Sequence, residues 1–139
     1  MAPTVQELRE AVAGKLQPAL QSSTNVHAYA DTYSPPVVFV YPRSVDYDAQ
    51  MARGGDEWEL VVRAVAQNLD RNGQVFLDNL ANPSGALSVK ALLEADQTLD
   101  GLARGVRVVR MENYQEYVFE GRAATWGCEF VVFIEATGS

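Results

Sequence analysis

The residues most able to do chemistry on a substrate are few in this chain. His27 is the sole histidine, and no second histidine or cysteine stands near it at the spacing of a zinc site. Cys128 is the sole cysteine and falls on the apolar side of an alternating segment, where a small buried hydrophobe is expected rather than a nucleophile. We therefore predict no metal centre and no catalytic thiol.

Two polar segments carry residue types that occur in ligand sites. The Asp-Tyr-Asp sequence at residues 46–48 offers carboxylates, but the further ligands and the glycine of a calcium loop are missing. The Arg-Gly-Gly sequence at residues 53–55 is not followed by Gly-Lys-Ser/Thr, and it precedes a strand-like segment rather than a helix. Neither segment predicts a cofactor.

Glutamates alternate with apolar residues in two segments, at Glu57 and Glu59 and again at Glu129 and Glu135. This period of two is typical of a strand with one solvated face and not of a paired general acid and base. We predict no catalytic residue, no bound cofactor and no enzymatic activity.

Composition is that of an ordinary globular domain. The chain has 139 residues, 47% of them apolar and 21% charged, which predicts one domain over residues 1–139. A net charge of −7 argues against a broad basic face for nucleic-acid phosphates. The N-terminal sequence lacks the pattern of a signal peptide, and no apolar run reaches the ~20 residues of a membrane span, so we expect synthesis in a cytoplasm and no membrane partner.

The apolar periodicity predicts three helices. One begins at a Thr4–Glu7 capping box, carries a stripe through Leu8, Val12 and Leu16, and is limited by Pro18. The second lies within residues 69–81, with Val75, Phe76 and Leu80 inward and Leu77 at the margin. The third is a short helix in the crossover at residues 82–101, with Ser88 as its N-cap.

Strands are predicted between and after these helices. A short one lies within residues 26–33, and a buried one at residues 37–41 is ended by Pro42. Alternating segments at residues 57–67, 106–112 and 124–136 complete the set, and residues 43–56 form a long polar connection. This order predicts an α+β fold: a mixed, mostly antiparallel sheet of four to five strands with helices packed on one face.

Four apolar residues lie at positions where a solvated sheet face would carry polar side chains. Val61, Val65, Val131 and Phe133 are apolar residues on the nominally polar sides of two strands. Either a helix of the same chain or another copy of the protein would cover them. The 43–56 connection also carries residue types that are enriched at protein interfaces. We predict a contact surface that comprises Tyr47, Met51, Arg53, Asp56, Val61, Val131 and Phe133.

A pattern over nearly the whole chain resembles the tail terminator proteins of long-tailed bacteriophages. The pattern consists of Glu7-Leu8 in the first helix, a strand ending in Val40-Tyr41-Pro42, Tyr47-Asp48 before Arg53-Gly54-Gly55-Asp56, the strand at residues 60–66, the helix with residues 76–80, the segments at residues 85–92 and 96–101, and the last strand at residues 126–130.

The resemblance implies a structural role in a virion. Proteins of this family form rings, usually hexameric, that cap the tail tube at the end nearest the head, end its polymerisation and present a surface for head attachment. The implied partners are other copies of the chain, the tail tube protein and a head-completion or connector protein, while genomic DNA passes through the lumen without specific binding. The implied location is the head–tail junction of the virion, after assembly in the host cytoplasm.

Two alternatives stay open at this point. A head-completion or connector protein on the portal side has similar size and mixed α/β character. A small ligand-binding or enzyme domain of α+β type belongs to a different class, and a deep polar cavity in a monomer would favour it.

Overall fold

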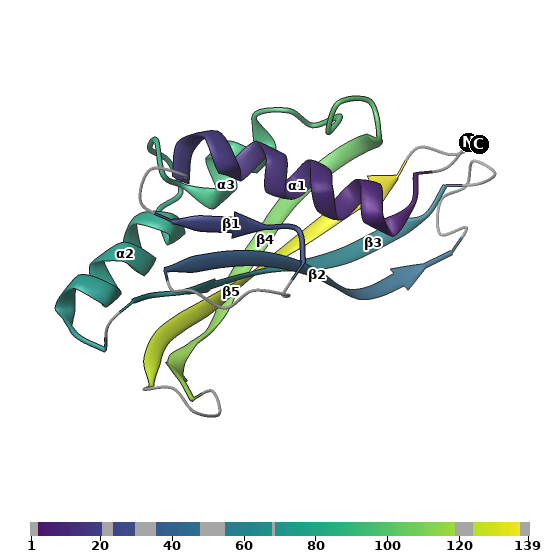
Figure 1. Ribbon diagram of the computed structural model, residues 1–139. Helices are drawn as coiled ribbons and strands as arrows, with labels where there is room; N and C mark the ends of the chain where they lie inside the picture. The colour runs from purple at the N-terminus through teal and green to yellow at the C-terminus, as the bar shows by residue number, and fades with distance from the viewer. Residues whose placement is uncertain are drawn as a thin grey trace.

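The computed structural model describes residues 3–20, 24–29, 36–47, 55–67, 69–118 and 124–136. Within these residues three helices and five strands follow one another along the chain (Figure 1). Their bounds are α1 Val5–Leu20, β1 Asn25–His27, β2 Val37–Asp46, β3 Glu57–Val65, α2 Arg71–Ala81, α3 Val89–Glu94, β4 Ala103–Tyr117 and β5 Thr125–Ala136.

The five strands form one sheet in the order β1-β2-β3-β5-β4. β1 runs parallel to β2, and the other three pairs are antiparallel. Side chains of all three helices join a single core with one face of this sheet. The predicted α+β class is therefore confirmed, with five strands and the helices on one face.

The first helix begins as predicted but ends later. The Thr4 N–H donates to Glu7 Oε1 at 2.9 Å and the Glu7 N–H donates to Thr4 Oγ1 at 3.1 Å, which is a complete capping box. Pro18 does not stop the helix, which continues to Leu20. A proline in the last turn removes a single backbone hydrogen bond, and Leu20, only 1% exposed, holds that turn in the core.

The strand expected to stop at Pro42 also runs further, to Asp46. The register of β2 against β3 shifts between Pro42 and Ser44, which marks a β-bulge. β1 pairs only with the first three residues of β2, so β2 becomes an edge strand beyond Phe39, and proline is tolerated at edges and bulges. The predicted 43–56 connection thus begins four residues too early.

The second helix packs Phe76 and Leu80 on the core as predicted, but the predicted places of Val75 and Leu77 are wrong. Asp70 is its N-cap and accepts from the Gly73 N–H at 3.1 Å. Leu77 and Leu80 are buried, whereas Val75 is 45% exposed. Helical residues advance by about 100° each, so Val75 lies on the side away from the Gly73–Leu77 stripe.

The crossover from β3 to β4 contains α3. Ser88 accepts from the Ala91 N–H at 3.1 Å, which confirms the predicted N-cap. A left-handed turn at Leu99, Asp100 and Gly101 then leads into β4. Lys15 of α1 joins this turn to the first helix through ion pairs of 2.9 Å with Asp96 and Asp100.

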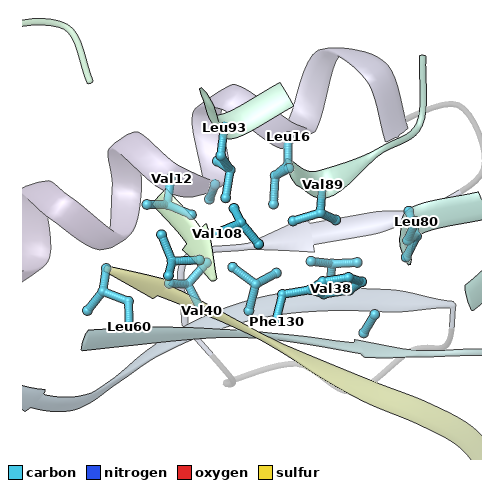
Figure 2. Close-up of a cluster of buried hydrophobic side chains, with 14 of the residues drawn as sticks. Val12, Leu16, Val38, Val40, Leu60, Leu80, Val89, Leu93, Val108 and Phe130 are labelled. Carbon is cyan, nitrogen blue, oxygen red and sulfur yellow. The ribbon is translucent and has the colours of Figure 1, made fainter. Parts of the chain in front are cut away.

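The core lies between the helices and the inner face of the sheet, as Figure 2 shows. Val12 and Leu16 of α1 and Leu93 of α3 are fully buried against Val40 and Phe130 of the sheet. These contacts fix the sheet as a rigid platform whose other face carries the site described next.

Candidate functional site: the helix-free face of the sheet

The second face of the sheet carries none of the described helices, and we call it the helix-free face. Alternation along β3 points Trp58, Leu60 and Val62 into the core, so the residues between them face the opposite way. Across the strands Tyr41, Val61, Val131 and Arg110 lie side by side on this face.

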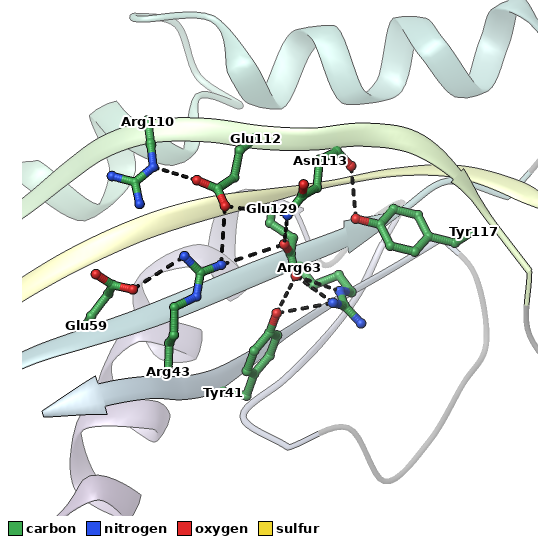
Figure 3. A network of polar contacts seen from close by, with 9 residues as sticks. All are labelled: Tyr41, Arg43, Glu59, Arg63, Arg110, Glu112, Asn113, Tyr117 and Glu129. Atoms are coloured by element: carbon green, nitrogen blue, oxygen red, sulfur yellow. Dashed lines mark hydrogen bonds and ion pairs between the residues drawn. The ribbon is translucent and has the colours of Figure 1, made fainter.

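Val61 and Val131 are fully buried although no described helix covers them. On the same face the long side chain of Arg43 extends from the bulge of β2 toward carboxylates of the neighbouring strands (Figure 3). Its guanidinium pairs with three carboxylates on three strands: Glu59 at 3.3 Å, Glu112 at 3.5 Å and Glu129 at 3.7 Å. The side chain of Arg43 thus joins β2 to the other three antiparallel strands on this face.

Glu129 is the centre of this polar network and is only 3% exposed. Its carboxylate accepts from the Tyr41 hydroxyl, from Asn113 Nδ2 at 2.5 Å, and from Arg63 Nε and Nη2 at 3.1 and 2.5 Å. Burial opposes ionisation of Glu129, but these hydrogen bonds outweigh it and hold its pKa below the usual value. Glu129 is thus a buried anion with its acceptor positions filled.

Arg63, the partner of Glu129 on β3, is surrounded by aromatic rings. Its guanidinium carbon lies 5.2 Å from the ring centroid of Tyr117, 5.3 Å from that of Tyr41 and 5.9 Å from that of Phe39. Burial raises the pKa of Tyr117 to about 12, so its hydroxyl stays protonated and donates to the Asn113 carbonyl at 2.9 Å. The rings shield the Arg63–Glu129 pair from water.

Asn113 reaches Glu129 because of its backbone. Its φ of 56° is left-handed, and it stands where the register of β4 against β5 shifts between Glu112 and Gln115. Asparagine tolerates this conformation better than most residues. Sequence alternation alone gives no sign of this bulge, so it does not predict the network around Glu129.

A hollow opens at the end of the helix-free face where β3 and β4 begin and β5 ends. It has a volume of about 300 Å³ and is lined by Glu57, Gln97, Gly105, Val106, Arg107, Phe133 and Glu135. Phe133 is partly exposed there, unlike the buried Val131 of the same strand. The hollow thus presents an aromatic side chain between charged ones.

Three acidic residues lie side by side on neighbouring strands at the same end of the sheet. Asp46 stands directly opposite Glu57, and Glu57 stands directly opposite Glu135. We call these three residues the acidic row. None of the ion pairs found within the described residues involves the acidic row.

The predicted contact residues divide into three groups. Tyr47 is 72% exposed directly after β2. Asp56 precedes β3, and its backbone carbonyl accepts from the Ala136 N–H at 2.9 Å, so both residues lie with Phe133 at the acidic end. Val61 and Val131 stand opposite each other in the middle of the face and are fully buried. Met51 and Arg53 lie outside the described residues.

His27 and Cys128, which were considered above as reactive groups, both lie in strands of the sheet. His27 is partly buried in β1. Burial raises the pKa of Cys128 to about 12, so it is a protonated thiol inside the core. Over the described residues, no group of three or more His, Cys, Asp or Glu side chains is arranged to hold a metal ion. In that same part of the chain, every helix is too short or too polar to cross a membrane.

Fold and site together define an α+β domain whose sheet is packed with helices on one side and carries a charged and aromatic network on the other. No protein-family model matches the sequence. No curated protein matches it either.

Proposed function

We propose that the protein is a structural component of a bacteriophage virion that forms a ring on the head-proximal end of the tail tube. The whole-length resemblance to tail terminator proteins supports this role. In it, the ring ends polymerisation of the tube and offers the surface to which the head attaches.

The observation that carries the proposal is the convergence of Tyr47, Asp56 and Phe133. They come from three separate segments, were predicted as contact residues from the sequence, and lie at one end of the helix-free face. A rigid sheet with an exposed aromatic residue, a hollow and charged side chains at one end has the composition of a protein-binding surface.

The proposed mechanism is steric and electrostatic. Copies of the chain associate around the axis of the tube and stack on its last ring, so that no further tube subunit has access. A chain with a net charge of −7 would give the ring a lumen to which DNA adheres weakly. A lumen lined by arginine and lysine would contradict that part of the mechanism.

Imaging of assembled particles tests the proposal. The protein is labelled at its C-terminus with a gold-binding tag, and tails are examined by negative-stain electron microscopy. We expect one label site at the head-proximal end of each tail, and tails of irregular length when the gene is deleted. Label along the whole tube, or tails of normal length without the protein, would overturn the proposal.

A further inference from the structure

We propose that a second hollow, between the end of α2 and the middle of β4, receives Tyr47 of another copy of the chain, so that copies associate head to tail. The inference rests on the proposed ring and deepens it, because it names the two surfaces through which one copy meets the next. It depends on the lining of the hollow, on the charge at its rim, and on where the hollow and Tyr47 lie in the sheet.

The lining of this hollow is mainly apolar. Its volume is about 220 Å³. Leu80 and Phe130, which are 1% and 3% exposed, line it from the core, and Met111 lies beside them at 38% exposure. The flexible side chain of methionine adapts to the shape of a bound group, and its sulfur makes favourable contacts with aromatic rings. The lining therefore suits an aromatic side chain of a partner.

The charged residues at the rim are both cations, Lys90 and Arg110, and none of the described residues that line the hollow is acidic. The carboxylates that pair with them are less exposed. Side-chain exposure is 46% for Lys90 and 49% for Arg110, but 24% for Glu94 and 30% for Glu112. Within the described part of the chain Arg110 donates through Nε alone, which leaves the N–H groups of its two terminal nitrogens for a partner. The rim thus presents positive charge outward.

Tyr47 of another copy offers the complementary features. It is 72% exposed and directly follows Asp46, which stands opposite Glu57. An aromatic ring beside carboxylates matches an apolar hollow with cations at its rim. Repulsion between the net charges of two copies is screened beyond about 8 Å at physiological ionic strength, whereas partly buried pairs in contact are screened much less. Local complementarity can therefore hold together two copies of an acidic chain.

The hollow and Tyr47 lie at opposite sides of the sheet. In the strand order β1-β2-β3-β5-β4, β4 is one edge, and β2 is the other edge beyond Phe39. Tyr47 follows β2, whereas the hollow borders β4. A contact between two different surfaces of the same chain is heterologous, repeats from copy to copy, and closes into a ring if the rotation between copies allows. One contact of this kind is enough to build the proposed ring.

Photo-cross-linking of the purified full-length protein tests the inference. Tyr47 is replaced by benzoylphenylalanine, which keeps an aromatic ring at this position, and cross-linked dimers are mapped by mass spectrometry. We expect the cross-link to fall on the segment of the other copy that contains Met111. The matched control carries benzoylphenylalanine at Val118, which is 76% exposed after the opposite end of β4, and should give about tenfold less of this cross-link.

A pair of charge variants tests the rim. With benzoylphenylalanine at position 47, Arg110→Gln should lower the yield of cross-linked dimer about threefold, because the rim loses a cation. Arg71→Gln removes the same charge at an exposed position of α2 outside the lining, and should leave the yield unchanged. Equal effects of the two variants would show that the dimer responds only to net charge, and the inference would be wrong.

Three other results would overturn the inference. They are the absence of cross-linked dimer, cross-links from position 47 that map elsewhere on the second copy, and cross-links in assembled tails that reach only a different protein. The position of the protein on the tail is measured separately by microscopy. This inference and the proposed function can therefore fail independently.

Discussion

At the scale of single residues, Gly127 leaves the space that the Tyr117 ring occupies on the helix-free face. A Cβ built at this position would lie 2.5 Å from Tyr117 Cδ2, 2.7 Å from Tyr117 Cε2 and 3.0 Å from the Ala64 carbonyl oxygen. The ring of Tyr117 therefore lies directly over the backbone of β5, from where it approaches Arg63. The glycine is required by close approach and not by backbone conformation.

We expect Gly127→Ala to lower the free energy of unfolding by about 1–3 kcal/mol, because the backbone of Ala64 has little freedom to move away. Denaturant unfolding followed by circular dichroism measures the change. Gly105→Ala is the matched control, since a Cβ there meets only the flexible Glu135 carboxylate, at 3.9 Å. Equal stability of the two variants would contradict the close packing at Gly127.

The protonation of Glu129 makes the stability of the fold depend on pH. Burial raises its pKa, but the hydrogen bonds it accepts lower it by more, so the folded-state pKa lies below the ordinary value of 4.5. Such a carboxylate stabilises the fold fully above the pKa of the unfolded chain, and this contribution is lost as the pH falls through the folded-state pKa.

We expect Glu129→Gln to cost about 1–3 kcal/mol at neutral pH, because Arg63 and Tyr41 lose their anionic partner. The gap in unfolding free energy between wild type and variant should narrow as the pH falls below the ordinary glutamate pKa of 4.5 and through the lower folded-state pKa of Glu129. Unfolding curves at a series of pH values test this. Glu94 and Asp96, whose pKa values are also lowered, are present in both proteins and do not affect the comparison.

At the scale of elements, β4 is the long edge strand of the sheet. In its first half, side chains of the same chain form hydrogen bonds with backbone groups at this edge. The N–H groups of Val106 and Val108 donate to Gln97 Oε1 at 3.0 Å and Glu94 Oε2 at 2.9 Å, and Lys90 Nζ donates to the Val108 carbonyl at 3.3 Å. Register shifts interrupt the second half. Such features oppose pairing with another sheet, so we expect subunits to associate through faces and not through strand edges.

The residues that close this edge belong to α3 or follow it, and α3 depends on its N-cap. Ser88 is fully buried, accepts from the Ala91 N–H and donates to the Asn82 carbonyl at 2.5 Å. We expect Ser88→Ala to lower the free energy of unfolding by about 1–2 kcal/mol. Ser84→Ala, at an exposed position of the same crossover, should change it by less than about 0.5 kcal/mol. Thermal unfolding of both variants decides the point.

At the scale of the whole molecule, charge is distributed unevenly over one face. The middle of the helix-free face is neutralised by three arginines, whereas the acidic row at its end is not. We expect Glu57→Gln to raise the free energy of unfolding by about 0.2–1 kcal/mol at low salt, because it removes repulsion from both neighbours. The gain should shrink in high salt, where surface charges are screened.

Glu59→Gln is the control on the same strand. Glu59 pairs with Arg43, so its neutralisation should leave stability unchanged or slightly lower. A loss of stability in Glu57→Gln would show that Glu57 has a stabilising partner and would contradict the expected repulsion within the acidic row.

Assembly provides a test at the same scale. Tyr47 is 72% exposed, so Tyr47→Ala should leave the unfolding curve of the isolated protein unchanged. Under the proposed function it should reduce the fraction of tails that carry the protein, because a residue of the contact surface is lost. Val118→Ala, at a 76% exposed position after the opposite end of β4, should leave that fraction unchanged.

The local parts of the fold follow from the sequence. The Thr4–Glu7 capping box, the Ser88 cap and the inward alternation of β3 and β5 depend on residues a few positions apart, and these predictions are confirmed. The two bulges were not predicted, because a bulge is decided by pairing with a distant strand. The predicted end of this strand at Pro42 is wrong for the same reason, since an edge strand accommodates a proline that a central strand rejects.

The sequence by itself determined that one face of the sheet would be buried under helices and that the other would carry charge and a few misplaced apolar residues. Only the tertiary structure decided which of these side chains meet on the second face. Register brings Arg63 of β3 to Glu129 of β5, Arg43 at the bulge of β2 pairs with Glu129 as well, and the same register aligns Asp46, Glu57 and Glu135. Side chains far apart in the chain meet only through strand pairing, which no local pattern specifies.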